Sequence, residues 1–266
     1  MIKSIFVIEE IIGGTGMLFW GKKKKRLPDI IVGFVLLKSF GYNFNKLKIN
    51  LKNEWGIEIN DTAEEDTIAF NIDDMLIACS FVPEPIPDHE VESHYKDNWM
   101  WKDAEKEVSK HKSHVIISIL NGRDSIERYK IFTKLASSIL VDKEAIAVYM
   151  SPMIIERETY ICLAKELKIG KLPVLLWVYI GIANSQNGIS AYTLGLNHFK
   201  KKEIEILNSV RECEDLFEFI LRIVNEIIKN DINVERGSLF RIGKKELSFK
   251  VSSGVFVNGK SLKITY

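Results

Sequence analysis

The chain has 266 residues, of which 46% are apolar and 27% charged, and its 16 glycines and 6 prolines exclude collagen-like and low-complexity classes. Three widely spaced cysteines, an odd number, favour a reducing compartment over a disulfide framework, so we expect a cytoplasmic protein. The longest apolar runs, 30–37 and 172–183, are shorter than the roughly 18 to 20 residues of a membrane-crossing helix, so no membrane span is predicted.

The first predicted elements are a strand and a helix. Residues 29–37 are rich in β-branched and large apolar side chains, which is typical of a buried strand. Apolar residues then recur at helical spacing between Phe44 and Trp55. Asn43 stands where an N-cap belongs and Gly56 stands just past the end, so both helix boundaries are predicted.

An antiparallel strand pair follows this helix. Residues 67–72 and 75–82 are predicted strands joined by a turn at two aspartates, Asp73 and Asp74. Three prolines within 83–87 then fit neither a helix core nor a sheet interior, and they predict an extended crossing over the surface. We therefore expect an N-terminal β-α-β-β lobe over residues 1–82.

Helices and strands alternate through the rest of the chain. Predicted helices cover 88–95, 101–111, 124–139, 155–167 and 215–229, and predicted strands cover 115–120, 145–150, 174–183, 189–196, 203–206 and a terminal β-meander within 240–266. This order predicts an α+β fold of mixed, largely antiparallel sheets covered by helices, arranged as two interlocked lobes. The larger α/β lobe would span 83–266; one continuous domain is the alternative.

The net charge of +1 is unevenly distributed along the chain. Residues 54–110 hold 16 acidic and 4 basic side chains, a net charge of −12, whereas residues 1–53 carry +7. If these carboxylates share one surface, they attract a basic protein and repel nucleic acid. The basic run 22–26 has no interleaved aromatic residues, so it indicates a solvated loop rather than a nucleic-acid contact.

Four stretches resemble a bacterial family known as domain-of-unknown-function family 4261. They are Phe81–Pro87, Trp99–Glu105, His111–Ser118, and Thr193–Leu196 together with Glu203–Ile206. The resemblance runs from about Asp29 to the C-terminus and rests on the order and spacing of the stretches. It implies bacterial origin and a shared fold, and it brings no activity with it.

Two of these stretches contain candidate binding residues. Trp99 and Trp101 flank a single residue, so a loop there could present two indoles to a partner, with Asp103 close by. Glu203 and Glu205 alternate with isoleucines, so both carboxylates lie on one strand face. They are candidates for binding, and they could form an acid and base pair only if burial raised the pKa of one of them. On an edge strand they are better explained as solvated residues that discourage aggregation.

His111 and His114 are the candidates for a metal site. With His89 or His94, or with a carboxylate such as Asp103, they could ligate zinc. The alternative is structural: one imidazole lies at a helix C-terminus and the other enters a strand.

The sequence predicts a cytoplasmic bacterial protein that acts by binding another protein rather than by catalysis. The partner expected from the acidic segment is a basic protein, such as a toxin that the chain neutralises as an immunity protein. The alternative function is a metal-dependent hydrolase centred on His111 and His114, with zinc as its cofactor.

Overall fold

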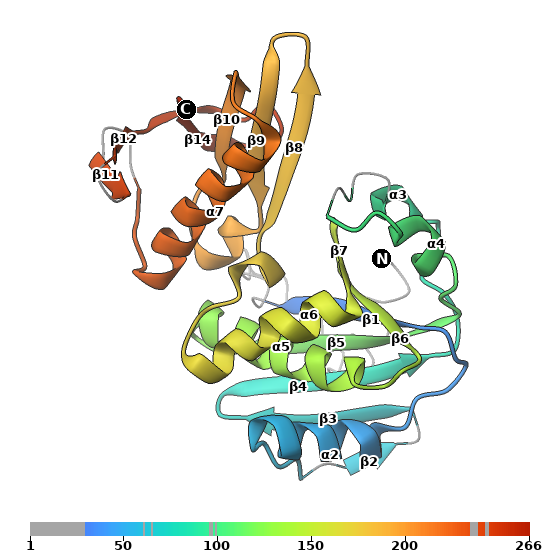
Figure 1. Cartoon of the computed structure of the whole chain (residues 1–266). Helices are drawn as coiled ribbons and strands as arrows, with labels where there is room; N and C mark the ends of the chain where they lie inside the picture. The colour runs from blue at the N-terminus through green and yellow to red at the C-terminus, as the bar shows by residue number, and fades with distance from the viewer. Residues whose placement is uncertain are drawn as a thin grey trace, which may run out of the picture.

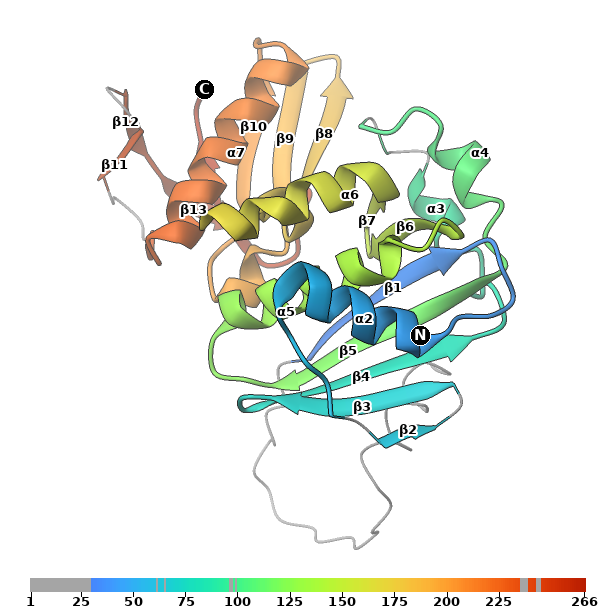
Figure 2. The ribbon, with the colours of Figure 1, turned by 60° about the horizontal axis from the view of Figure 1, so that its bottom comes forward.

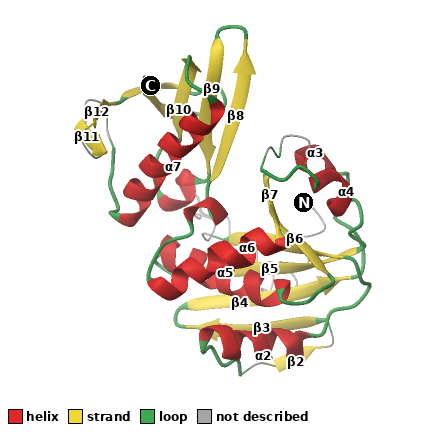
Figure 3. Cartoon of the chain, in the orientation of Figure 1, coloured by secondary structure: helices red, strands yellow, loops and turns green. Residues whose placement is uncertain are grey.

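The computed structural model describes residues 30–60, 62–64, 66–95, 98, 100–234, 239–242 and 245–266. They form an α+β fold with two main β-sheets, mostly antiparallel, and helices packed on them (Figure 1, Figure 3). Among these described residues, no helix combines the length and the apolar character that a bilayer crossing requires.

The larger sheet has seven strands in the order β2-β3-β4-β5-β1-β6-β7. These strands are β1 Ile31–Leu37, β2 Thr62–Glu64, β3 Thr67–Ile72, β4 Met75–Val82, β5 Ser113–Asn121, β6 Ala145–Met150 and β7 Met153–Glu156. All neighbouring pairs run antiparallel. The apolar strand β1 lies inside the sheet, as its composition predicts, with Val35 opposite Val115 on one side and Val148 on the other.

The proline stretch after residue 82 does not separate two sheets. Strand β4 pairs with β5 from Met75 opposite Asn121 to Val82 opposite His114, so both sides of the expected 82/83 division belong to one sheet. The chain leaves this sheet only after β7. The prolines predict the surface crossing, but local sequence does not predict that β5 returns to pair with β4.

Helices cover one face of the larger sheet. They are α2 Phe44–Trp55, α5 Ser125–Leu140 and α6 Arg157–Ala164, and Figure 2 shows α2 beside α5 on that face. The predicted caps of α2 are confirmed, because Asn43 accepts a hydrogen bond from the Asn45 N–H at 2.9 Å and Gly56 has a φ of 66°. Asp124 caps α5 in the same way, from the Ile126 N–H at 2.7 Å.

The second sheet has five strands in the order β13-β14-β10-β9-β8, with helix α7 packed against β8 and β9. Its elements are β8 Tyr179–Ser185, β9 Gly188–Leu194, β10 Ile204–Ser209, α7 Cys213–Lys229, β13 Lys250–Ser253 and β14 Lys260–Ile264; β11 Leu239–Ile242 and β12 Lys245–Ser248 form a separate hairpin. The end of the chain is therefore not a simple meander, because β14 pairs in parallel with β10.

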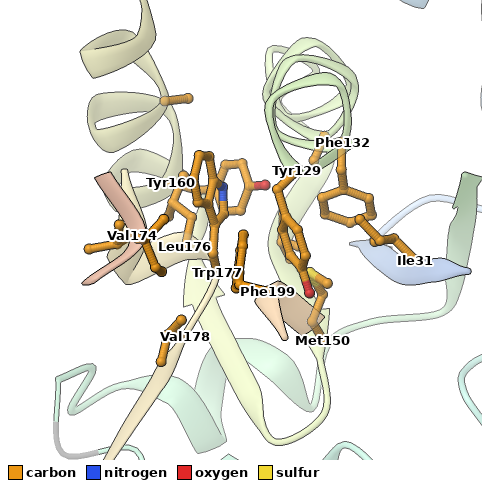
Figure 4. Packing of buried hydrophobic residues seen from close by; sticks show 14 of the residues in the cluster. Ile31, Tyr129, Phe132, Met150, Tyr160, Val174, Leu176, Trp177, Val178 and Phe199 are labelled. Carbon is orange, nitrogen blue, oxygen red and sulfur yellow. The ribbon is translucent and has the colours of Figure 1, made fainter. Parts of the chain in front are cut away.

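One hydrophobic core joins the two sheets. Figure 4 shows Tyr129 of α5 beside Trp177 and Phe199, which belong to the segments that enter and connect the second sheet. The Tyr129 and Phe199 ring centroids lie 4.9 Å apart, and the Trp177 indole N–H donates to Thr133 Oγ1 at 2.9 Å. These contacts hold the second sheet against the helices of the first. Short 3-10 turns complete the connections: η1 Lys165–Ile169, η2 Val174–Leu176 and η3 Leu196–Phe199.

Candidate functional site

An apolar hollow lies between the two sheets, with β7 of the larger sheet and β8 of the second sheet among the elements that line it. Its volume is about 710 Å³, counted to include its opening to solvent. It is lined by His94, Asn98, Met100, Trp101, Pro152, Met153, Ile154, Ile155, Glu156, Thr159, Leu163, Leu175, Val178, Tyr179, Ile180 and Phe217. Most of these side chains are apolar, which is typical of sites that bind a ligand or a partner's side chains.

His94, Asn98, Met100 and Trp101 form one wall of the hollow. They belong to the segment 84–107, which contains the short helix α3, Glu92–Tyr95, and all but the last residue of α4, Ala104–Val108. This segment is fixed to the sheet by a second core cluster, in which Ile86 and Val108 pack with residues of β1, β6 and β7. Met100 is 54% exposed at this wall. The wall therefore presents apolar side chains from a segment that is itself anchored.

Trp101 is the sequence-predicted site residue that the structure brings to the hollow. It is half-buried, packs against the second core cluster and also lines the hollow. Asp103 is exposed just before α4, and its side chain makes no capping bond there. Trp99 lies outside the described residues.

Polar groups gather at the mouth of the hollow, where the Ser151–Pro152 turn, with a cis peptide bond, joins β6 to β7. Ser151 Oγ lies 3.3 Å from His94 Nε2, and the Tyr149 hydroxyl donates to Glu90 at 3.0 Å. Burial and, to a smaller extent, the negative charge of nearby Glu90 raise the pKa of Tyr149, so its hydroxyl stays protonated. A serine beside a histidine begins a nucleophilic pair, but no described carboxylate bonds His94, so the orienting third group is missing.

His111 and His114 serve the scaffold. The His111 Nδ1 atom donates to the Val108 carbonyl at 2.7 Å, and its Nε2 accepts from the Ile86 N–H at 3.3 Å. The His114 Nδ1 atom donates to the Glu84 carbonyl at 2.8 Å, and burial lowers the pKa of this imidazole to about 4. Both rings thus hold the proline stretch against β5. Among the described residues, no group of three or more His, Cys, Asp or Glu side chains is arranged to hold a metal ion.

Glu203 corrects the expectation of a solvated edge strand. β10 lies between β9 and β14, and Glu203, just before it, is only 9% exposed. Its carboxylate accepts from Thr193 Oγ1 at 2.7 Å and from the Gly195 and Asn197 N–H groups at 3.0 and 3.2 Å. Burial raises its pKa, although these bonds oppose the shift. The side chain fixes the turn after β9 and is not available to a partner.

Glu205 is likewise buried, with 0% exposure, although it was expected to be solvated. It accepts from the N–H groups of Val255 and Phe256 at 2.9 and 2.6 Å, and it is bonded by Ser261 Oγ and Lys263 Nζ. Burial favours the protonated form, but Lys263 and the other donors outweigh it and lower the pKa. This carboxylate therefore pins the loop between β13 and β14.

The described carboxylates of residues 54–110 do not converge on one surface. Asp73 and Asp74 join β3 to β4, whereas segment 84–107 begins near the other end of β4. Glu54 forms an ion pair with Lys168 at 2.7 Å, and Glu58 pairs with Lys52 at 2.9 Å. Within this stretch the segment 84–107, which supplies one wall of the hollow, carries eight acidic and three basic side chains in the sequence, a net charge of −5.

Residues 192–265 match the family model described as Domain of unknown function (DUF4261). This part of the chain is a DUF4261 domain. The three resembling stretches before residue 192 lie outside the match. No curated protein and no solved structure matches the chain.

The DUF4261 domain runs from β9 to β14, so it supplies most of the second sheet. Its Glu203 and Glu205 fix two loops of that sheet by accepting backbone N–H bonds. Most of the hollow lies in residues before the domain, with Phe217 of α7 the one lining residue within it. Sequence reasoning missed the hollow because its walls come from segments that meet only in the folded chain.

Proposed function

We propose that the protein acts by binding another protein, and that the hollow between the two sheets is the docking site. The observation that carries the proposal is an apolar cavity whose lining includes an exposed methionine and a half-buried tryptophan, side chains that anchor protein partners. Among the described lining residues Glu156 is acidic and none is Lys or Arg, and the segment 84–107 that supplies one wall has a net charge of −5 in the sequence.

This charge favours a basic partner, because complementary potentials steer association. We propose as the partner a basic toxin that the chain neutralises by occlusion, in the cytoplasm of a bacterium. The described cysteines are unpaired, which agrees with a reducing compartment. The polar groups at the mouth, Ser151 and His94, then orient the partner rather than attack it.

The test is quantitative binding to a basic toxin encoded beside the gene, with two matched variants. Met100→Glu places a charge in the hollow, whereas Ile169→Glu changes a residue that is 70% exposed and does not line it. We expect Met100→Glu to weaken binding by about tenfold or more and Ile169→Glu to leave it nearly unchanged. Association should also slow as salt rises. Equal affinity of all three proteins would refute the docking site, and folded protein that binds no such toxin would refute the function.

The alternative, a metal-dependent hydrolase with zinc at His111 and His114, has no structural observation in its favour. Three of the four ring nitrogens already bond backbone groups. Elemental analysis of the purified protein tests it: stoichiometric zinc that is lost on substituting His114 would replace the binding proposal with this one.

A further inference from the structure

Two outer strands of different sheets meet at the hollow. β7 is the last strand of the larger sheet, and β8 is the last strand of the second sheet. Both contribute lining residues, Met153–Glu156 from β7 and Tyr179 with Ile180 from β8. Figure 1 and Figure 2 show β8 as the strand of its sheet nearest to β7. The hollow is thus bounded by two sheet edges as well as by apolar side chains.

The edge of β8 offers main-chain groups to a partner. A two-residue turn joins Ser185 to Gly188, which makes these two residues a hydrogen-bonded pair of the β8–β9 ladder. Alternation along the strand then directs the N–H and C=O groups of Ile180, Ile182 and Asn184 away from β9. Within the described chain, these outward groups make no backbone hydrogen bond outside the sheet. Such an edge is a template for one more strand.

One position on the edge of β7 is already occupied. The turn at Ser151 and Pro152 pairs Met150 with Met153, so the Ile154 carbonyl points away from β6. The Asn98 side chain donates to this carbonyl at 2.7 Å. An amide from the wall segment therefore takes one position that a neighbouring strand would need on β7, whereas the described outward backbone groups of β8 have no such contact.

We propose that the segment of the partner bound in the hollow is an extended strand that pairs with β8, with apolar side chains facing the hollow and lysine or arginine between or beside them. The proposal rests on the function proposed above and specifies which part of the partner is bound. Strand addition obtains affinity from main-chain bonds and specificity from alternate side-chain sites.

Charge complementarity selects this occupant. None of the described lining residues is Lys or Arg, while Glu156 lines the hollow. In the described part of the wall segment, next to the lining residues, four acidic side chains are exposed, Glu84, Asp88, Asp103 and Glu105, against two basic ones, Lys102 and Lys106. A strand carrying basic residues neutralises this wall, whereas an acidic strand is repelled by it.

The probe is a fluorescent peptide of about eight residues in which valine alternates with lysine, long enough to span β8. Two N-methylated forms, one methylated at the valines and one at the lysines, each lose the N–H groups of a single strand edge and keep all side chains. We expect one form to lose about tenfold or more in affinity and the other to bind as well as the parent. Equal binding by both forms, or no binding of the parent peptide, overturns the proposal.

On the protein, Ile182→Pro removes an outward N–H at an edge position where proline is tolerated, and Ile182→Ala controls for the lost side chain. The proline variant should bind the parent peptide about tenfold more weakly than the alanine variant. If a toxin binds the proline and alanine variants with equal affinity but binds Met100→Glu more weakly, strand pairing is refuted and the proposed function is left intact. Two outcomes would assign the edge of β8 to this chain itself and overturn the proposal of a partner strand. One is self-association of the protein that Ile182→Pro abolishes, and the other is peptide binding that appears only when residues 1–29 are removed.

Discussion

Glu205 offers the sharpest test of the packing described above. Glu205→Gln removes a negative charge that is 0% exposed and leaves Lys263, whose side chain is 16% exposed, without its buried counter-charge. It also replaces one acceptor oxygen with an NH₂ group that faces the donors from Val255 and Phe256. Breaking one partner of a buried pair costs about 3 to 5 kcal/mol, and the partial exposure of Lys263 favours the lower end.

The assay is equilibrium unfolding in urea. A loss of about 3 kcal/mol lowers the midpoint by about 1 M if the slope is about 3 kcal/mol per molar, as suits a chain of this size. Glu246→Gln is the matched control, because Glu246 pairs with Arg241 at the surface, where an ion pair is worth about 0 to 1 kcal/mol. A Glu205→Gln midpoint no lower than that of the control would refute the assignment of Glu205 as the anchor of its loop.

Two further predictions concern the scaffold. The pKa of His114 falls from 6.5 to about 4 on folding, so the unfolded chain binds a proton more readily than the folded chain. The contribution of His114 to the free energy of unfolding is therefore fully present above pH 6.5 and falls by at most about 3 kcal/mol as the pH is lowered to 4. His114→Asn should remove that slope from urea midpoints measured across this range, and the exposed His89→Asn should not; equal slopes would contradict the burial argument. Gly181→Ala should cost about 1 to 3 kcal/mol, because its Cβ would lie 2.3 Å from the Tyr192 ring, whereas Gly41→Ala meets nothing within 4 Å; thermal midpoints that shift equally would argue against this contact.

Local rules predicted local structure well. The caps Asn43 and Gly56 each depend on neighbours a few residues away, and the structure confirms both. The hairpin predicted from 174–183 and 189–196 exists, but β8 begins only at Tyr179 because residues 174–176 form a 3-10 turn that carries the chain into the second sheet. A run of apolar residues does not distinguish a strand from a buried turn.

Long-range pairing is what the sequence could not supply. The alternation around Glu205 predicted its face, but its burial depends on β14, whose Lys263 is 58 residues later in the chain. The hollow depends in the same way on the approach of residues 98–101 to β7 and β8. Trp101 was found because it stands one residue from Trp99 in a predicted loop. His94 was considered only as a zinc ligand, and Ser151 and Asn98 carried no comparable sequence pattern.

The parallel pairing of β10 with β14 has a consequence for how the chain matures. β10 acquires one of its two neighbours only when residues 260–264 arrive, so a growing or shortened chain that stops before them leaves the Glu205 charge without Lys263 and Ser261. A chain cut short within β14 keeps the strands of the larger sheet but leaves one edge of β10 unpaired and the Glu205 carboxylate short of two partners, so we expect proteases to cleave it more readily.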